Sequence, residues 1–314
     1  MGFFMGQIGL ILACLLAGQA FCSEGLRVVC SSSIPADWSR GIAHRTTEVT
    51  SLMAPGTDPH AFQPTPGHVK QLLRADLIVG FDPLLEPWLQ QIIDSNKLQS
   101  KVLWIGKPWI SDKGGHLACC PSEGSGAKHT LLRRQEGVDP HVWTDPELVE
   151  AMGRSLHAAL LKTPGSLQFE GGEARLAAFV ATARAVDADL RAILGAVPES
   201  RRGVLTHHDN LGRLAGRYGL RIEGVILRAA TTEAADPSAR EMVRFAELAR
   251  QRAVRAIVVD RGVRATAAET IAREAGLPPP VALRIDTLAA EGEAATWAGM
   301  MRESARTLAE ALAQ

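Results

Sequence analysis

The tripeptide Asp-Pro-His occurs twice in this chain, at residues 58–60 and 139–141. Proline fixes its own φ at about −65° and restricts the residue before it to extended conformations, so each histidine follows a stiff stretch of backbone. A neutral imidazole nitrogen is a common metal ligand. His60 and His141 are therefore two candidate ligands that the backbone holds in place.

Two further candidate ligands follow apolar runs in the second half of the chain. His208 follows residues 203–207, and Asp286 follows residues 281–285. Ligands of open parallel sheets bind beyond the carboxyl ends of the strands, where both side chains are predicted to lie. Three imidazoles and one carboxylate predict a divalent first-row ion, Zn²⁺ first, with Mn²⁺ or Fe²⁺ as alternatives. His207 remains an alternative to His208, because neighbouring strand residues point in opposite directions.

The residues beside these candidates have more than one interpretation. Asp58 and Asp139 either accept a hydrogen bond from the far ring N–H of a ligating histidine or only stabilise the turn of their own loop, and the sequence slightly favours the second role. Arg284 lies two residues before Asp286. Alternation along a strand places both side chains on one face, where the guanidinium would pair with the carboxylate.

These side chains need a scaffold that brings distant segments together. Short β-branched runs alternate with helical patterns, which predicts an α/β fold of two lobes with mostly parallel sheets. A long amphipathic pattern predicts a rigid helix that joins the lobes, with the metal site in the cleft between them. The predicted division is a signal peptide at 1–22, an N-terminal lobe at 23–166 that contains an exposed loop at 107–137, a linker helix at 167–196 and a C-terminal lobe at 197–314.

The boundaries of several elements are marked in the sequence. Thr65 and Asp145 are predicted helix N-caps, because each precedes a proline that suits the first helical position. The predicted strands cover residues 26–32, 44–53, 76–81, 101–106, 203–207, 223–227, 256–260 and 281–285.

The charge balance and the N-terminus limit the possible partners. The 34 Lys and Arg residues balance 34 Asp and Glu residues, so no basic surplus favours nucleic acid or a membrane surface. The apolar run from Ile8 to Ala20 is short for a membrane span and predicts a cleaved signal peptide and export to the periplasm or another extracytoplasmic space. A buried N-terminal helix is the alternative. A lipid anchor at Cys22 is not favoured, because the residues before it fit a lipoprotein site poorly.

Three cysteines would remain after cleavage: Cys30, Cys119 and Cys120. An odd number cannot all pair within the chain, and adjacent cysteines seldom bond to each other. Cys30 with one of the other two is the only easy disulfide, and the sequence does not decide between a disulfide, a metal site and free thiols. The predicted loop at 107–137 also holds His116 and His129, so a metal-capturing loop is an alternative to the favoured solvated loop.

Four segments of the chain resemble a known family. "APGTDPHAFQPTPGHVKQLLRADLIV", "DPHVWTDPELVEAM", "LTHHDNLGRLAGRYGL" and "RIDTLAAEGEAATWAGMMRESARTLAEAL" are similar, in this order, to the metal-binding segments of the zinc/manganese ABC-transporter solute-binding proteins. The resemblance implies two α/β lobes, a long connecting helix and a metal held between the lobes.

The resemblance also implies a ligand set. His60 and His141 match the histidines of the family's two Pro-His motifs. The family's His-Asp-(Ala)-(aromatic)-Gly pattern aligns with "HDNLG", which selects His208 over His207, and its Thr-Asp-Ser-Leu segment aligns with "RIDTL", which supplies Asp286.

The sequence thus predicts an exported, monomeric binding protein that captures zinc, or next manganese, for an ABC permease in the membrane and catalyses no reaction. One alternative is a secreted zinc hydrolase with Glu136 or Asp209 as general base, although the chain has no His-Glu-x-x-His motif. The other is a binding protein for an organic metal chelate.

Overall fold

The computed structural model describes residues 25–59, 61–110, 139–164, 171–227 and 237–314. The predicted signal peptide, His60 and nearly all of the predicted loop at 107–137 lie outside these ranges. Within them, no helix is both long enough and apolar enough to cross a membrane.

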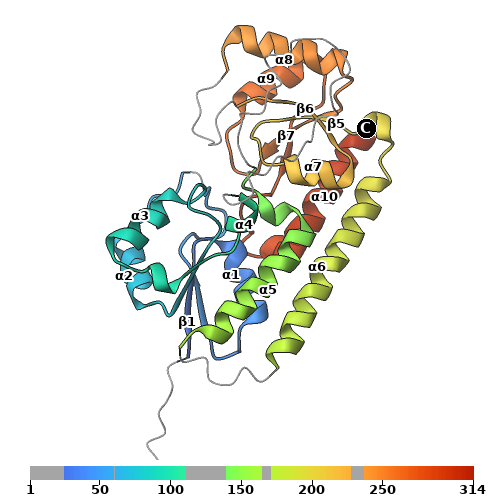
Figure 1. Ribbon diagram of the computed structural model, residues 1–314. Helices are drawn as coiled ribbons and strands as arrows, with labels where there is room; N and C mark the ends of the chain where they lie inside the picture. The colour runs from blue at the N-terminus through green and yellow to red at the C-terminus, as the bar shows by residue number, and fades with distance from the viewer. Residues whose placement is uncertain (1–24, 60, 111–138, 165–170, 228–236) are drawn as a thin grey trace, which may run out of the picture.

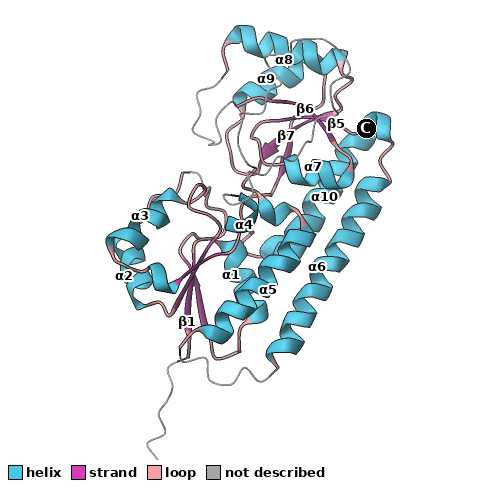
Figure 2. Ribbon diagram, in the orientation of Figure 1, coloured by secondary structure: helices cyan, strands magenta, loops and turns pink. Residues whose placement is uncertain are grey.

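The first lobe is built on a parallel four-stranded sheet of order β2-β1-β3-β4. Figures 1 and 2 show this sheet with its helices in the lower part of the molecule. Thr65 accepts a hydrogen bond from His68 N, and Asp145 accepts one from Glu147 N, so both predicted N-caps are confirmed. The elements are β1 (Arg27–Cys30), α1 (Ser33–Ile42), β2 (Glu48–Ser51), α2 (Pro66–Arg74), β3 (Leu77–Gly80), α3 (Pro87–Ser95), η1 (Gln99–Lys101), β4 (Val102–Trp104), α4 (Lys107–Ile110), η2 (Val142–Thr144) and α5 (Pro146–Lys162).

The second lobe repeats this plan with a parallel sheet of order β6-β5-β7-β8. In both sheets the chain moves from a central strand to one side and then to the other, and this reversal leaves a crevice at the carboxyl ends of the strands. The elements are η3 (Glu199–Arg201), β5 (Gly203–Thr206), α7 (Gly212–Tyr218), β6 (Arg221–Val225), α8 (Ala239–Gln251), β7 (Ala256–Asp260), α9 (Thr266–Ala275), β8 (Val281–Leu283) and η4 (Glu293–Ala295). The predicted fold class is confirmed.

Two long helices connect the lobes. α6 (Gly172–Gly195) has 24 residues and so is about 36 Å long at about 1.5 Å per residue. Figure 1 shows it beside both lobes, with α5 and α10 (Trp297–Ala313) packed against it. α10 also packs against α1, so the last helix of the chain returns to the first lobe.

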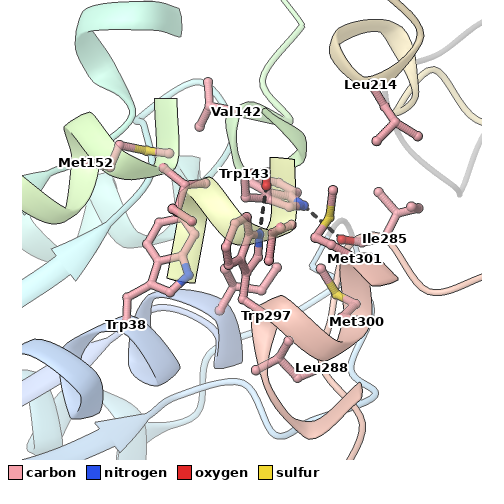
Figure 3. Close-up of a cluster of buried hydrophobic side chains, with 14 of the residues drawn as sticks. Trp38, Val142, Trp143, Met152, Leu214, Ile285, Leu288, Trp297, Met300 and Met301 are labelled. Carbon is pink, nitrogen blue, oxygen red and sulfur yellow. Dashed lines mark hydrogen bonds between the residues drawn. The ribbon is translucent and has the colours of Figure 1, made fainter. Parts of the chain in front are cut away.

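The apolar core is continuous between the two sheets. One buried cluster includes residues of β1 and β3 together with residues of β5 and β7. At its centre, Trp143 Nε1 donates to the carbonyl of Ile285 at 2.8 Å, and Trp297 Nε1 donates to the carbonyl of Trp143 at 2.8 Å (Figure 3). These indole hydrogen bonds join η2 of the first lobe to the segment after β8 and to α10.

Several elements differ from the sequence-based expectation; β2, for example, covers only Glu48–Ser51 of the strand predicted at 44–53. α1 was not predicted. The first residues of the predicted exposed loop form α4, where Ile110 is buried. β6 begins at Arg221, two residues before the predicted strand.

Cys30 is buried in β1 and forms no disulfide with any residue that the structure describes. Its Sγ lies 3.3 Å from Ser39 Oγ, and burial raises its pKa to about 12. Burial and the raised pKa both disfavour the thiolate, which is the reactive form of the side chain. Cys119 and Cys120 lie outside the described residues.

Candidate metal centre

The structure brings three of the four predicted ligands together. One donor atom from each of His141, His208 and Asp286 lies within 4.8 Å of the other two. His141 comes from the first lobe, and the other two come from the carboxyl ends of β5 and β8 in the second. Both histidines are buried, and the Asp286 side chain is 8% exposed. The cluster therefore lies at the junction of the lobes.

Asp139 fixes the orientation of His141. Its Oδ1 accepts hydrogen bonds from the backbone N–H of His141 at 3.0 Å and from the ring Nδ1 at 2.8 Å. A carboxylate oxygen only accepts, so Nδ1 carries the proton and Nε2 presents its lone pair. Nε2 lies 3.9 Å from Asp286 Oδ1. Asp139 thus fills both of the roles considered from the sequence, since it stabilises its own turn and orients the imidazole.

Arg213 at the start of α7 holds the segment that carries Asp139. Its backbone N–H donates to Asp139 Oδ2 at 3.1 Å. Its guanidinium donates to the Asp139 carbonyl at 2.8 and 3.1 Å and to the Trp109 carbonyl at 3.0 Å. The first-lobe ligand is therefore fixed directly to the second lobe.

The geometry distinguishes the two adjacent histidines. His207 continues the strand hydrogen bonding, because its N–H donates to the Val258 carbonyl and its own carbonyl accepts from Leu227 N. β5 ends at Thr206, whose hydroxyl donates to the His208 carbonyl. The His208 ring lies edge-on to that of His141, with centroids 5.2 Å apart. Among the described residues, His208 and not His207 belongs to the donor cluster.

Asp286 is held by an amide rather than by the neighbouring arginine. Its Oδ2 accepts a hydrogen bond from Asn210 Nδ2 at 3.0 Å. The guanidinium of Arg284 instead donates to the Leu288 carbonyl at 3.4 Å. The ion pair expected between Arg284 and Asp286 is not among those formed by the described residues, because the chain leaves the strand at Leu283 and alternation no longer applies.

Asp260, the last residue of β7, is a member of the site that the sequence did not identify. Its Oδ1 accepts from Asn210 Nδ2 at 2.6 Å, and its Oδ2 is buried. Burial, followed by the negative charge of Asp286, raises its pKa to about 7. Its position at the carboxyl end of a predicted strand was the one available signal.

His60 lies outside the described residues, but the loop before it is attached to the site. The backbone N–H of Gly56 donates to Thr287 Oγ1 at 2.9 Å and to the Leu288 carbonyl at 3.0 Å. Leu288 N–H in turn donates to Ser33 Oγ at 3.1 Å. Gly56, which lies four residues before His60, is therefore hydrogen-bonded to the segment that follows Asp286.

The charges around His141 favour a bound cation. Burial lowers the pKa of His141, but the negative charges of Asp286 and Asp139 outweigh this effect, so its pKa lies above the ordinary value. The same charges would stabilise a metal ion in place of the proton.

The donor set suits a small divalent ion. Ligands about 2.0 to 2.2 Å from a tetrahedral Zn²⁺ lie about 3.3 to 3.6 Å from one another. The largest separation here is below 4.8 Å, so inward movements of about 1 Å complete the geometry. Two imidazoles and a carboxylate leave a fourth position of the tetrahedron for one more ligand.

Two parallel-sheet lobes, a long helix beside both and a buried donor cluster at their junction define a two-lobed α/β binding protein. Comparison with known sequences identifies the family within this class. Residues 28–311 match the family described as zinc-uptake complex component A, periplasmic, and the chain belongs to this family.

Individual relatives agree with this assignment. The metal ABC transporter substrate-binding lipoprotein FimA of Streptococcus parasanguinis is 26% identical over 312 residues, which cover 97% of this chain and 94% of the relative. Zinc-binding protein AdcA of Streptococcus pyogenes is 24% identical over 84% of this chain, which spans about half (51%) of that longer relative. The solved periplasmic zinc-binding protein TroA of Treponema pallidum shares the fold, with a TM-score of 0.77 and 24% identity over 92% of this chain and 100% of TroA.

Proposed function

We propose that this protein is an extracytoplasmic solute-binding protein that captures one divalent transition-metal ion between its lobes and delivers it to an ABC permease. The convergence of His141, His208 and Asp286 from both lobes carries the proposal. His60 is proposed as the fourth ligand, because it follows the loop that Gly56 attaches to the segment after Asp286. The metal is cargo, and the protein catalyses no reaction.

Zinc is the proposed cargo, and manganese is second. A donor set with more nitrogen than oxygen favours zinc, which also binds more tightly than manganese or iron in the general affinity order. The named relatives support a metal cargo, since AdcA and TroA are described as zinc-binding. Manganese is the second candidate because a further relative, PsaA of Streptococcus pneumoniae, is described as a manganese ABC transporter substrate-binding lipoprotein and is 24% identical over 98% of this chain.

Export and a monomeric state complete the proposal. The apolar run at residues 8–20 supports export by a signal peptide, and the family description is periplasmic. We propose lobes at residues 23–166 and 197–314 joined by the helix at 167–196. A lipid anchor at Cys22 is not favoured by the residues before it, although FimA is described as a lipoprotein.

Calorimetric titration of chelator-treated protein with Zn²⁺ and Mn²⁺ tests this proposal, together with metal analysis of protein purified without chelator. We expect one tight equivalent in the native protein and its loss in the His141→Ala, His208→Ala double variant. His44→Ala is the matched control, because this ring contacts Thr46 outside the cluster. Unchanged binding in the double variant would overturn the proposal.

His60 is tested separately. His60→Ala is expected to weaken zinc binding by removing one of four ligands. The same affinity as in His44→Ala would remove His60 from the proposed set but leave the other three.

A further inference from the structure

Asn210 lies between two carboxylates at the candidate metal centre. Its Nδ2 donates to Asp260 Oδ1 at 2.6 Å and to Asp286 Oδ2 at 3.0 Å. Both partners are acceptor oxygens, so the amide must present its NH₂ group to them, with one proton for each. Asn210 is 1% exposed, and water therefore does not compete for these protons.

The topology of the second sheet explains this arrangement. Asn210 follows β5 by four residues, Asp260 ends β7, and Asp286 follows β8 by three residues. β5, β7 and β8 are consecutive neighbours in the sheet, so their carboxyl ends meet at one edge. The three side chains are thus brought together by the same edge that carries His208.

The amide makes the two oxygens of Asp286 unequal. Oδ2 is occupied by the Asn210 proton. Oδ1 is buried, accepts no hydrogen bond from the described residues and faces His141 Nε2 at 3.9 Å. Only Oδ1 is therefore available to a metal ion between the lobes.

We propose, on the basis of the proposed function, that Asn210 is a positioning residue that restricts Asp286 to ligation through one oxygen and thereby favours zinc over manganese. Zinc in a nitrogen-rich site is four-coordinate, and one carboxylate oxygen completes that shell. Manganese prefers more oxygen ligands, and a carboxylate that binds through both oxygens supplies one of them. Asn210 withholds that second oxygen.

Asp260 keeps Asn210 in this orientation. Its short hydrogen bond holds one amide proton, so the other is directed at Asp286. The restraint on the Asp286 carboxylate therefore depends on the side-chain amide of Asn210.

The test compares Asn210→Ala with the native protein. Affinities for Zn²⁺ and Mn²⁺ are measured by competition with a chelator, and visible spectra are recorded with Co²⁺, whose four-coordinate complexes absorb strongly and whose six-coordinate complexes absorb weakly. Asn96→Ala is the matched control, since that amide donates to the Ile92 carbonyl at the end of α3. Asp260→Ala is a second variant that removes the acceptor of the other Asn210 proton and so loosens Asn210.

We expect Asn210→Ala to lower the ratio of zinc to manganese affinity about tenfold, the scale on which residues that orient metal ligands act. Its Co²⁺ bands should weaken, Asp260→Ala should change both measurements in the same direction, and Asn96→Ala should match the native protein. An unchanged ratio and spectrum in Asn210→Ala, or an equal loss of both metals, would overturn this inference alone. Failure of the native protein to bind either metal would overturn the proposed function, and this inference with it.

Discussion

Replacing Asp139 by asparagine tests how the first-lobe ligand is oriented. Among the hydrogen bonds that the carboxylate accepts from described residues are those from His141 N at 3.0 Å, from His141 Nδ1 at 2.8 Å and from Arg213 N at 3.1 Å. An asparagine has one acceptor oxygen and one NH₂ group, so it cannot accept at both ends.

Both orientations of the new amide are unfavourable. If its oxygen faces His141, the NH₂ meets the backbone N–H of Arg213, and a buried donor loses its acceptor at a cost of about 1 to 3 kcal/mol. If its NH₂ faces His141, Nδ1 must accept and Nε2 takes the proton, which removes the lone pair that would bind the metal. The first orientation costs stability. The second costs affinity and also leaves the backbone N–H of His141 without its acceptor.

We expect Asp139→Asn to weaken zinc binding by about ten- to a hundredfold, the usual effect of losing a carboxylate that orients a metal-bound histidine. This corresponds to about 1.4 to 2.8 kcal/mol. Because the charge of Asp139 raises the pKa of His141, the variant should also bind zinc down to a lower pH, relative to its own maximum, than the native protein does.

Calorimetric titration with zinc at several pH values measures both effects. Asp76→Asn is the matched control, because this exposed carboxylate accepts one backbone hydrogen bond, from Arg27 N, at the opposite end of the first sheet. Zinc affinity within about twofold of the native value in Asp139→Asn, with the same pH dependence, would refute the assigned role, since a real loss is at least about tenfold.

Three further predictions follow from the contacts. Below the pKa of His141, which lies above its ordinary value, zinc affinity should fall about tenfold per pH unit, because zinc must displace the proton that the imidazole binds. Titration with zinc between pH 5.5 and 8 measures this slope, and an affinity that does not change with pH would contradict it. Trp143→Phe removes the donor to the Ile285 carbonyl and should lower the free energy of unfolding by about 1 to 3 kcal/mol in urea; an unchanged value would contradict this. Gly153→Ala places a Cβ 2.2 Å from Phe179 Cε1, where α5 packs against α6. It should lower the free energy of unfolding by about 1 to 3 kcal/mol in urea and leave zinc affinity unchanged. An unchanged free energy of unfolding would contradict this and show that the two helices move apart without cost.

The sequence predicted the fold well because its signals are local. Prolines after Thr65 and Asp145 mark two helix starts, and β-branched runs mark the eight strands of the described residues. α1 was missed because its serines, proline and glycine resemble a loop, and burial of one face against the core decides its structure. The return of α10 to the first lobe also depends on packing, since Trp297 and Met300 are buried in the core that both sheets share.

The site was predicted only where a motif or a strand end marked it. Asp-Pro-His indicated His141, and a strand end indicated Asp286. Periodicity did not choose between the adjacent histidines, because β5 ends before them and the loop sets their directions. Asn210 and Asp260 were missed because their contact depends on β5, β7 and β8 being neighbours, and the sequence does not give the strand order.

X-ray diffraction from crystals of the zinc-loaded protein, recorded on both sides of the zinc absorption edge, tests the central claim most directly. The account predicts one anomalous peak between the lobes, about 2.0 to 2.2 Å from His141 Nε2, a ring nitrogen of His208 and Asp286 Oδ1. A zinc peak that contacts none of these three side chains would contradict it.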